Sequence, residues 1–344
     1  MGTVTTQRML NVAVVGAGYW GPNLVRNFDG MPDCRVAWVC DSKPGRQTYM
    51  AGKFPGLRLT ADYRTVLDDP EVDAIAIATP VSTHYDLATA ALRAGKHVMV
   101  EKPLADTVAH AEGILEAADR AGLVAATDHL FVYNPAIAKM REIQEQGRLG
   151  ERCYAESSRV NLGPPASEVD VIWDLATHDL AITYYLWGCL PKEVAAIGRR
   201  FLHPRLIDVA FLHLKFADDS LAVHHVSWLS PEKVRRYFLA GRSGSVVFDD
   251  TVAEGKLRQI DQGVDSRIGL KDDDVKDLFY RPGTVSIPVL EPVQPLQAAC
   301  RNFLDCVRSG ARPRADARAG LAVVRMLEAA ERSIALGSQP VQLA

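Results

Sequence analysis

The 344-residue sequence lacks the features that most simply mark membrane, secreted and nucleic-acid-binding proteins. It contains no run of about eighteen apolar residues, so no membrane-spanning helix is indicated. Residues 1–9 include one arginine and no apolar core, so they do not read as a secretory signal. The 39 basic residues are balanced by 42 acidic ones, so the sequence lacks the excess of positive charge that is typical of proteins that bind nucleic acids. We therefore expect a cytoplasmic protein that binds neither membranes nor nucleic acids.

Cysteine is present, but in no pattern that indicates chemistry. The six thiols are scattered and form no Cys-x-x-Cys pair; they are Cys34, Cys40, Cys153, Cys189, Cys300 and Cys306. Such spacing is typical of reduced, mostly buried residues, and it favours neither disulfides nor a zinc site. The acidic run at Lys271–Asp274 is interpreted as a solvated loop. No metal is expected.

The first half of the chain instead contains a regular alternation of apolar strands and helices. Strands are expected at 10–15, 35–40, 74–78, 97–100 and 123–127, with helices at 22–28, 47–53, 63–67, 87–92 and 108–120. Near-continuous apolar strands separated by helices are typical of a parallel sheet covered on both faces. Because such connections are right-handed, the pattern predicts a doubly wound α/β domain over residues 1–127.

From residue 128 onward the pattern changes to strands that alternate between apolar and polar residues. Strands are expected at 153–160, 193–198, 206–216, 220–227 and 234–240, and helices at 135–146, 174–186, 295–309 and 315–336. Residues 261–295 are rich in proline and charge and are expected to form loop. Alternation indicates strands with one packed and one open face. Residues 128–344 are therefore predicted to form an α+β domain on a mostly antiparallel sheet.

The first strand runs directly into Gly-x-Gly-x-x-Gly, formed by Gly16, Gly18 and Gly21. The first glycine allows a tight turn, the second lets the backbone approach a pyrophosphate, and the third lets helix and strand pack closely. The N–H groups and the dipole of the following helix favour phosphate. This strand–turn–helix context predicts a Rossmann domain that binds a dinucleotide. Tyr19 and Trp20 lie inside the turn and either wall the cofactor or pack on the sheet.

Asp41 lies twenty residues after Gly21, at the end of the second strand. A carboxylate there accepts hydrogen bonds from the adenosine ribose and repels a 2′-phosphate. The sequence therefore favours NAD as the cofactor. NADP stays open as the cofactor, because hydrogen-bond donors on Ser42, Lys43 and Arg46 could bind its 2′-phosphate. A second alternative is that Asp41 is only an acidic turn residue.

Thr79, Pro80 and Lys102 all follow apolar strands of the predicted parallel sheet. Ligands of such sheets bind at the carboxyl ends of the strands, where the strand order reverses. Because Lys102 follows a buried strand directly, and Pro103 disfavours the helical region for it, its ammonium is expected to extend into that crevice. There it either transfers a proton or hydrogen-bonds the reacting oxygen. A surface lysine at a strand end is the structural alternative.

Asp174 and His178 are four residues apart in a predicted helix, which puts both on one helix face. A histidine of near-neutral pKa is well suited to take a proton from a hydroxyl group. A carboxylate one turn away can orient the imidazole or hold a second hydroxyl. No further cysteine or histidine lies at zinc-ligand spacing. A pair that merely lies on the helix surface remains the alternative.

Together these motifs resemble the Gfo/Idh/MocA oxidoreductases, the family of glucose–fructose oxidoreductase and inositol dehydrogenase. The resemblance covers nearly the whole chain and rests on Gly16–Gly21, Thr79–His84, Ala94–Pro103, Asp174–Asp179 and the closing helix Gly320–Ser333. It implies a nucleotide domain and an open-faced antiparallel sheet domain, through which members form homodimers or homotetramers. It also implies hydride exchange between a nicotinamide cofactor and a ring hydroxyl of a sugar or cyclitol.

The resemblance also implies roles for individual residues. Lys102, Asp174 and His178 would be catalytic, and Thr79, Pro80, His84 and Glu101 would line the cofactor together with Lys102. Candidates for substrate contact are Tyr133, Asn134, Arg159, Asn161 and Trp173. A guanidinium such as that of Arg159 suits a phosphate or a carboxylate.

The run Tyr19–Leu24, together with Trp173–Leu175 before His178, resembles members linked to amino-sugar and nucleotide-sugar pathways. We therefore expect an NAD(P)-dependent dehydrogenase that acts on a secondary ring hydroxyl of a nucleotide sugar or sugar phosphate, with C3 as one candidate position. The alternatives are a cyclitol dehydrogenase, an NAD-dependent glycosidase of the same family and a non-catalytic NAD-binding sensor.

Overall fold

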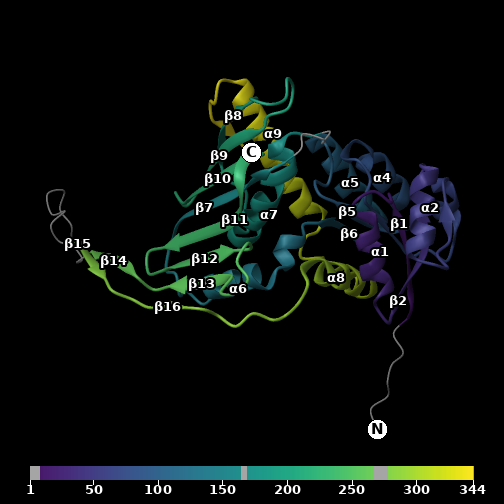
Figure 1. Ribbon diagram of the computed structural model, residues 1–344, viewed down its shortest axis with the longest axis horizontal. Coiled ribbons are helices and arrows are strands. Elements are labelled where there is room, and N and C mark those ends of the chain that lie inside the picture. Colours follow the sequence, from purple (N-terminus) through teal and green to yellow (C-terminus); the bar gives the residue numbers. More distant parts are fainter. Residues whose placement is uncertain (1–7, 164–168, 267–277, 344) are drawn as a thin grey trace, which may run out of the picture. The chain divides into compact units, whose positions relative to one another are not determined.

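The computed structural model describes residues 8–163, 169–266 and 278–343, and the chain divides into two compact units (Figure 1). Unit 1 comprises Met1–Tyr133 and Val293–Arg325, and unit 2 comprises Asn134–Pro292 and Met326–Ala344. The first junction lies close to the predicted boundary after residue 127. The prediction of one continuous second domain differs from this division, because the chain returns to unit 1 at Val293.

Unit 1 is built on a six-stranded sheet with the order β3-β2-β1-β4-β5-β6, in which every pair is parallel. Its strands are β1 (Leu10–Val15), β2 (Cys34–Cys40), β3 (Leu59–Thr60), β4 (Ala74–Ile77), β5 (His97–Glu101) and β6 (Ala125–Asp128). All four residues of β4 are buried, as expected for a strand covered on both faces. The order reverses between β1 and β4, which makes their carboxyl ends the expected binding crevice. This confirms the predicted doubly wound sheet.

The helices of unit 1 include two that the sequence placed in the second domain. They are α1 (Gly21–Asp29), α2 (Pro44–Lys53), α3 (Tyr63–Asp68), α4 (His84–Arg93), α5 (Val108–Ala121), α8 (Pro295–Ser309) and the start of α9 (Ala317–Ala335), with 3-10 turns η1 (Val81–Thr83) and η2 (Leu130–Tyr133). Phe303 of α8 packs edge-on against Phe28 of α1, with ring centroids 6.4 Å apart. Arg301 donates two hydrogen bonds of 2.7 Å to the Asp33 carboxylate. These contacts place α8 in unit 1.

Unit 2 is built on a nine-stranded sheet with the order β16-β13-β12-β11-β7-β10-β9-β8-β17. Its strands are β7 (Arg152–Leu162), β8 (Glu193–Arg199), β9 (Val209–Lys215), β10 (Leu221–Ser227), β11 (Leu229–Gly241), β12 (Ser245–Asp249), β13 (Leu257–Ile260), β16 (Val285–Ser286) and β17 (Val341–Gln342). Only β7 and β10 pair in parallel; the other neighbours are antiparallel. This confirms the predicted mostly antiparallel sheet.

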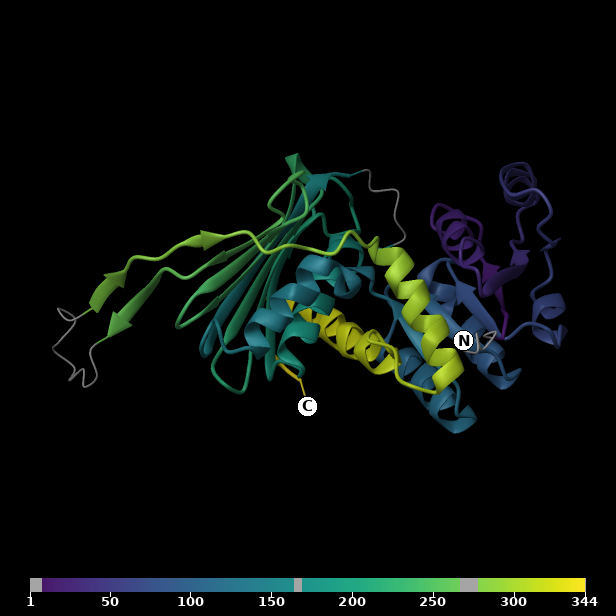
Figure 2. The same cartoon turned by 90° about the horizontal axis from the view of Figure 1, so that it is seen from below.

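One face of the sheet in unit 2 is covered by helices, as Figure 2 shows. These are α6 (Pro135–Glu145), the π-helical turn η3 (Ile172–Ala176), α7 (Thr177–Trp187) and the second half of α9. The strands alternate accordingly: in β9, Ala210, Leu212 and Leu214 are buried, whereas Phe211 between them is 42% exposed. The sequence pattern therefore correctly separated the packed face from the open one.

The expectation of loop over 261–295 is wrong for part of that stretch. Strand β16 extends the nine-stranded sheet, and β14 (Gly263–Ser266) pairs with β15 (Leu278–Arg281) as a separate two-stranded ribbon. These strands are two to four residues long and depend on partners far along the chain, so no local alternation reveals them. The acidic run at 271–274 lies outside the described residues.

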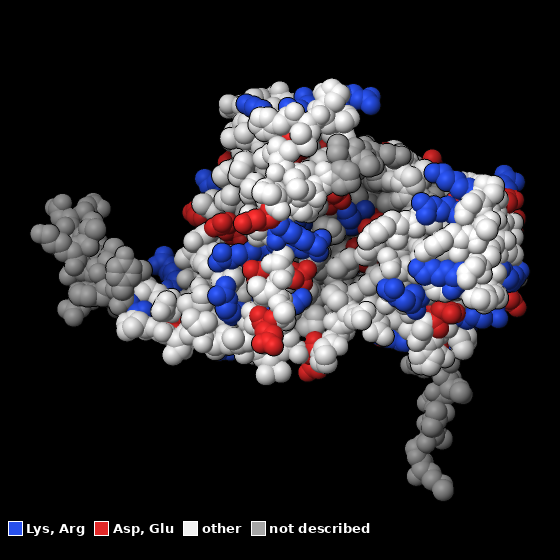
Figure 3. All heavy atoms as spheres, in the orientation of Figure 1, with Lys and Arg blue, Asp and Glu red and all other residues white. Residues whose placement is uncertain are grey.

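Surface charge in the described part of the molecule is mixed. Figure 3 shows lysine and arginine side chains interspersed with aspartate and glutamate on the face it presents. Among residues 8–163, 169–266 and 278–343, no helix is both long and apolar enough to cross a membrane.

Candidate functional site

The glycine turn after β1 has the backbone geometry that its sequence predicts. Gly16 has φ of +94°, and a Cβ on it would lie 2.4 Å from the Ala78 carbonyl oxygen. A Cβ on Gly21 would lie 2.0 Å from the Gly16 carbonyl oxygen, so this glycine is required for the close approach of α1. A Cβ on Gly18, in contrast, would meet nothing within 4 Å. Gly18 therefore leaves open backbone at the helix start, which is where a pyrophosphate fits.

Asp41 is held against this turn by two backbone hydrogen bonds. One carboxylate oxygen accepts from the Ala17 N–H at 2.7 Å, and the other accepts from the Lys43 N–H at 2.8 Å. Because a carboxylate has about four acceptor positions, it keeps capacity for ribose hydroxyls. The arrangement fits the predicted adenosine end of NAD.

His84 is a buried histidine at the start of α4. Its imidazole is 1% exposed, with Nε2 at 2.9 Å from the Thr79 carbonyl oxygen and Nδ1 at 3.0 Å from the Pro103 carbonyl oxygen. Burial lowers the pKa of His84 below its ordinary value. The side chain joins the segments that follow β4 and β5. It therefore fixes the backbone of Thr79 and Pro103, and its place beside the cofactor stays a prediction.

Trp20 and Lys102 lie at the same carboxyl edge of the parallel sheet. Lys102 directly follows β5, as predicted, and its peptide bond to Pro103 is cis. The Trp20 indole N–H donates a 3.0 Å hydrogen bond to Asp128 at the end of β6, so its polar edge faces the sheet. Tyr19 is 88% exposed. Among the described residues of unit 1, this edge therefore gathers the predicted cofactor residues Gly16, Gly18, Tyr19, Trp20, Gly21, Asp41, Thr79, Pro80, Glu101 and Lys102.

In unit 2, Asp174 and His178 lie where a π-helical turn meets an α-helix. Asp174 belongs to η3, and His178 is the second residue of α7. The predicted helix therefore begins with a π-helical turn, which is wider than an α-turn, and the shared face of the two side chains stays a prediction. Such turns are frequent at functional sites. The Asp170 carboxylate accepts from the N–H groups of Ile172 and Trp173, and burial raises the pKa of Asp170 to about 6.

The first turn of α7 is fastened to the sheet by a buried ion pair. Arg159 of β7 donates from Nε (3.1 Å) and Nη2 (2.8 Å) to the two carboxylate oxygens of Asp179. Their side chains are only 4% and 2% exposed. Asp179 follows His178 in the chain, so this pair fixes the backbone that carries the predicted catalytic histidine. The guanidinium expected to contact substrate thus lies against Asp179.

Beside this pair, a buried hydrogen-bond chain links α7 to the sheet. Ser157 Oγ lies 2.7 Å from His224 Nδ1, and Thr183 Oγ1 lies 3.1 Å from His224 Nε2 and 2.8 Å from the Tyr237 hydroxyl. Burial lowers the pKa of His224 to about 4. His224 is therefore a buried histidine whose two ring nitrogens both have partners.

The remaining candidates for substrate contact have structural partners within their own units. The Tyr133 hydroxyl donates to Asn302 and accepts from the Ala315 N–H. Asn134 caps α6 by accepting from the Ala136 N–H at 2.9 Å. The Asn161 amide donates to the Leu162 carbonyl oxygen. Trp173 is 6% exposed and hydrogen-bonds the Glu331 carboxyl. Their roles toward a substrate remain predictions.

Two buried residues near Lys102 did not emerge from the sequence. Asp128 is 0% exposed and His129 is 2% exposed, and burial raises the pKa of Asp128 to about 6 and lowers that of His129 to about 3. The available signal was their position, since both follow an apolar strand of the parallel sheet as Lys102 does. A buried, ionisable residue at that edge is a candidate for function.

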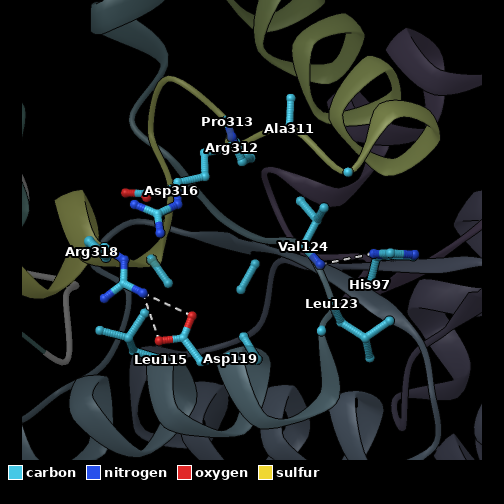
Figure 4. A pocket seen from close by; sticks show the side chains of 15 residues that line it. His97, Leu115, Asp119, Leu123, Val124, Ala311, Arg312, Pro313, Asp316 and Arg318 are labelled. Atoms are coloured by element: carbon cyan, nitrogen blue, oxygen red, sulfur yellow. Dashed lines mark hydrogen bonds and ion pairs between the residues drawn. The ribbon is translucent and has the colours of Figure 1, made fainter.

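A pocket of about 250 Å³ in unit 1 lies elsewhere (Figure 4). His97, at the start of β5, and Val124, just before β6, line it, and the Val124 N–H donates to His97 Nδ1 at 2.9 Å. Arg318 there is paired with Asp119 at 2.7 Å. The pocket therefore lies at the amino edge of the sheet, opposite the glycine turn. In the described part of the chain, no group of three or more His, Cys, Asp or Glu residues is placed to hold a metal.

Comparisons with known proteins agree with this geometry. The family model described as "Oxidoreductase family, NAD-binding Rossmann fold" matches residues 10–129, and the GFO/IDH/MocA C-terminal domain matches residues 137–247. Inositol 2-dehydrogenase 2 of Saccharopolyspora erythraea is 32% identical over 183 residues, which cover 52% of this chain and 54% of that protein. The match thus spans about half the length of this relative.

Two further similarities are to a UDP-N-acetylglucosamine 3-dehydrogenase and to a crystal structure that contains NAD. UDP-N-acetylglucosamine 3-dehydrogenase of Acidithiobacillus ferrooxidans is 33% identical over 190 residues, which cover 55% of this chain and 58% of that protein. The crystal structure of GenD2 from gentamicin A biosynthesis, in complex with NAD, is 25% identical, has a TM-score of 0.83, and covers 100% of this chain and 99% of its own.

The glycine turn, Asp41 and the doubly wound sheet define an NAD-binding oxidoreductase of the Rossmann type. Since both of its units match models of the same family, the chain belongs to the Gfo/Idh/MocA oxidoreductases. The resemblance seen in the sequence is thereby confirmed.

The glycine turn allows a test that separates folding from cofactor binding. Gly18→Ala should fold normally, because its Cβ meets open space, but it should bind NAD at least tenfold more weakly, because the methyl group occupies the approach of the pyrophosphate. Gly21→Ala should lower the melting temperature as well, because its Cβ meets the Gly16 carbonyl oxygen. Calorimetric titration with NAD and thermal unfolding measure the two effects. Unchanged NAD affinity in Gly18→Ala would contradict the proposal that the turn Gly16–Gly21 binds the pyrophosphate of NAD.

Proposed function

We propose that the protein is an NAD(P)-dependent dehydrogenase or ketoreductase that acts on a secondary ring hydroxyl or ketone of a sugar. NAD is the favoured cofactor because Asp41 presents a carboxylate beside the glycine turn. A nucleotide sugar or sugar phosphate is the favoured substrate class, with C3 as one candidate position. The 33% identity to a UDP-N-acetylglucosamine 3-dehydrogenase supports this choice.

The observation that carries the proposal is the place of Lys102. It follows β5 at the same sheet edge as the glycine turn and Asp41, within one unit of the protein. A protein that only binds NAD does not need an amine at that position. Lys102 therefore favours an enzyme over a sensor.

In the proposed reaction, bound nicotinamide supplies the hydride acceptor or donor. During oxidation His178 takes the hydroxyl proton, and Lys102 hydrogen-bonds the same oxygen as negative charge develops on it. Asp174 orients His178 or binds the neighbouring hydroxyl. During reduction His178 returns the proton, so that hydride and proton together convert the ketone to the alcohol.

The proposal is tested by absorbance at the wavelength of reduced nicotinamide. The protein is incubated with NAD or NADP and a panel of sugars, sugar phosphates, nucleotide sugars and cyclitols, and in reverse with reduced cofactor and the corresponding keto compounds. We expect at least one nucleotide sugar or sugar phosphate to reduce NAD, with a higher kcat/KM than with NADP. Absence of turnover with every substrate in both directions would overturn the dehydrogenase assignment.

The alternative of a cyclitol dehydrogenase is supported by similarity to a curated relative. The 32% identity to an inositol 2-dehydrogenase supports a cyclitol as substrate. The same panel separates the two, because a cyclitol dehydrogenase would reduce NAD with inositols and not with nucleotide sugars. Release of free sugar from a glycoside without net reduction of NAD would indicate the glycosidase chemistry instead.

A second copy of the chain is the proposed macromolecular partner, as a homodimer or homotetramer. The open face of the sheet in unit 2 exposes Tyr154, Ile197, Phe211 and Leu221 by 42–48%. Phe211 and His225 stack on this face with ring centroids 4.4 Å apart. Apolar side chains gathered on an open sheet face are typical of a protein interface.

A further inference from the structure

The main chain of Asp41 is held at the end of β2 by two hydrogen bonds in addition to those of its carboxylate. Its N–H donates to the Thr60 carbonyl oxygen of β3 at 3.1 Å. Its carbonyl oxygen accepts from Gln47 Nε2 of α2 at 2.8 Å. Because Ala17 and Lys43 donate to the two carboxylate oxygens, every polar atom of Asp41 has a partner within unit 1.

These four bonds determine where the Asp41 carboxylate lies before a cofactor arrives. A group whose conformation is already fixed loses less entropy when its ligand binds. The carboxylate is thus preorganised as an acceptor for the ribose hydroxyls of NAD. For the same reason it is a fixed negative charge against the 2′-phosphate of NADP.

Gln47 connects Asp41 to a helix that is packed on unit 1. It lies in the first turn of α2, six residues after Asp41, and its side chain is half-buried. Met50 follows three residues later on the same face of the helix and is 0% exposed. The amide that donates to Asp41 therefore comes from an anchored helix and not from an exposed loop.

The same segment contains cations that favour the competing cofactor. Lys43 and Arg46 are exposed and lie within five residues of Asp41. A guanidinium or an ammonium attracts a phosphate group. The choice between NAD and NADP therefore depends on a balance, in which the fixed carboxylate of Asp41 opposes these two positive charges.

We propose that Gln47 is a positioning residue for cofactor choice: its side-chain amide holds the Asp41 main chain so that the carboxylate favours NAD and disfavours NADP. This inference rests on the proposed preference for NAD. Loss of the amide donor frees the Asp41 carbonyl group, and the carboxylate then turns away from the ribose more easily. NAD loses an attraction and NADP loses a repulsion.

Gln47→Met tests the proposal because it keeps the length of the side chain and removes the N–H donor. Calorimetric titration of the whole protein with NAD and with NADP, without substrate, gives the ratio of the two affinities. The ratio should fall about threefold to tenfold in favour of NADP, the range expected for the loss of one hydrogen bond. General damage to the domain would weaken both cofactors alike and leave the ratio unchanged, which would overturn the proposal.

Thr48→Ala is the matched control on the same helix. Thr48 is exposed, and its hydroxyl donates to the Pro44 carbonyl oxygen within α2 at 3.1 Å, so it does not contact Asp41. Its ratio should equal that of the wild type. A fall as large as in Gln47→Met would mean that any loosening of α2 has the same effect, and it would contradict a specific role of Gln47.

A double-mutant cycle shows whether Gln47 acts through Asp41. In an Asp41→Ala background the carboxylate is gone, so the further change Gln47→Met should leave the ratio where it is. An equal fall in both backgrounds would overturn the proposal. If Gln47→Met does not fold, Gln47→Asn takes its place, because it keeps the amide but is one methylene too short for the 2.8 Å contact.

The outcome is independent of turnover, since only binding is measured. If the ratio shifts as expected but the wild-type protein turns over no substrate, the proposed dehydrogenase function fails and the role of Gln47 stands. A wild-type protein that binds NAD and NADP equally would overturn the role of Gln47, whatever reaction it catalyses.

Discussion

The Asp179→Ala variant should unfold with a free energy about 3–5 kcal/mol lower than that of the wild type. The physical reason is the guanidinium that remains. Arg159 is 4% exposed and donates twice to Asp179, so removing the carboxylate takes two charge-assisted hydrogen bonds from a buried cation. Urea denaturation followed by circular dichroism measures the loss.

A double variant provides the matched control. Arg159→Met with Asp179→Leu removes both charges and keeps much of the volume, and replacement of a buried pair by apolar residues is often neutral. We expect it to recover most of the stability that Asp179→Ala loses. A double variant as unstable as Asp179→Ala would show that the loss of this ion pair around a buried cation is not the cause. The turnover of the double variant would then show how far the proposed catalytic role of His178 depends on the Arg159–Asp179 ion pair.

Alanine at Lys102 or at His178 should lower kcat/KM about a hundredfold or more, because His178 is proposed to take the proton and Lys102 to hydrogen-bond the same oxygen in one step. The measurement is the initial rate of NAD reduction with whichever substrate the panel identifies. Thermal unfolding and NAD affinity should stay close to those of the wild type in His178→Ala, which separates lost chemistry from lost structure.

The double variant Lys102→Ala with His178→Ala distinguishes a shared step from two separate roles. Residues that act as a unit are strongly non-additive, so the double variant should lose little more than the worse single variant. Fully multiplicative losses would mean that the two residues act independently. A loss below tenfold in either single variant would contradict the role assigned to that residue.

Features that depend on residues close together in the chain could be predicted from the sequence. The glycine turn follows a buried strand and begins a helix, so Gly16, Gly18 and Gly21 indicated both the fold and the phosphate cradle. Asp41 and Lys102 could be placed because each ends a strand of a parallel sheet, and such strands end at a common edge.

Features that depend on contacts between distant residues could not be predicted. Helix α8 joins unit 1 because Phe303 meets Phe28 and Arg301 meets Asp33, and nothing in the local pattern of α8 names those partners. Short strands such as β16 could not be predicted for the same reason. Its two residues, Val285 and Ser286, form a strand because they pair with β13.

The sequence indicated which residues belong to the candidate site, but it did not indicate which other residues each of them contacts. Trp20 was placed near the cofactor, but the direction of its N–H toward Asp128 depends on how β6 lies in the sheet. Arg159 could have been found in part, since it shares the inward face of β7 with Ala155 and Ser157. A buried arginine needs a carboxylate, and Asp179 was available beside His178.

The discontinuous composition of unit 1 has a consequence for biosynthesis. Domains often fold as the chain leaves the ribosome, beginning with the N-terminal one. Here the parallel sheet is complete at Asp128, but Val293–Arg325, which contains α8 and the start of α9, emerges only after nearly all of unit 2. Until then Phe28 and Asp33 lack their partners on α8. The nucleotide half of this oxidoreductase is thus first to be synthesised and among the last parts to be finished.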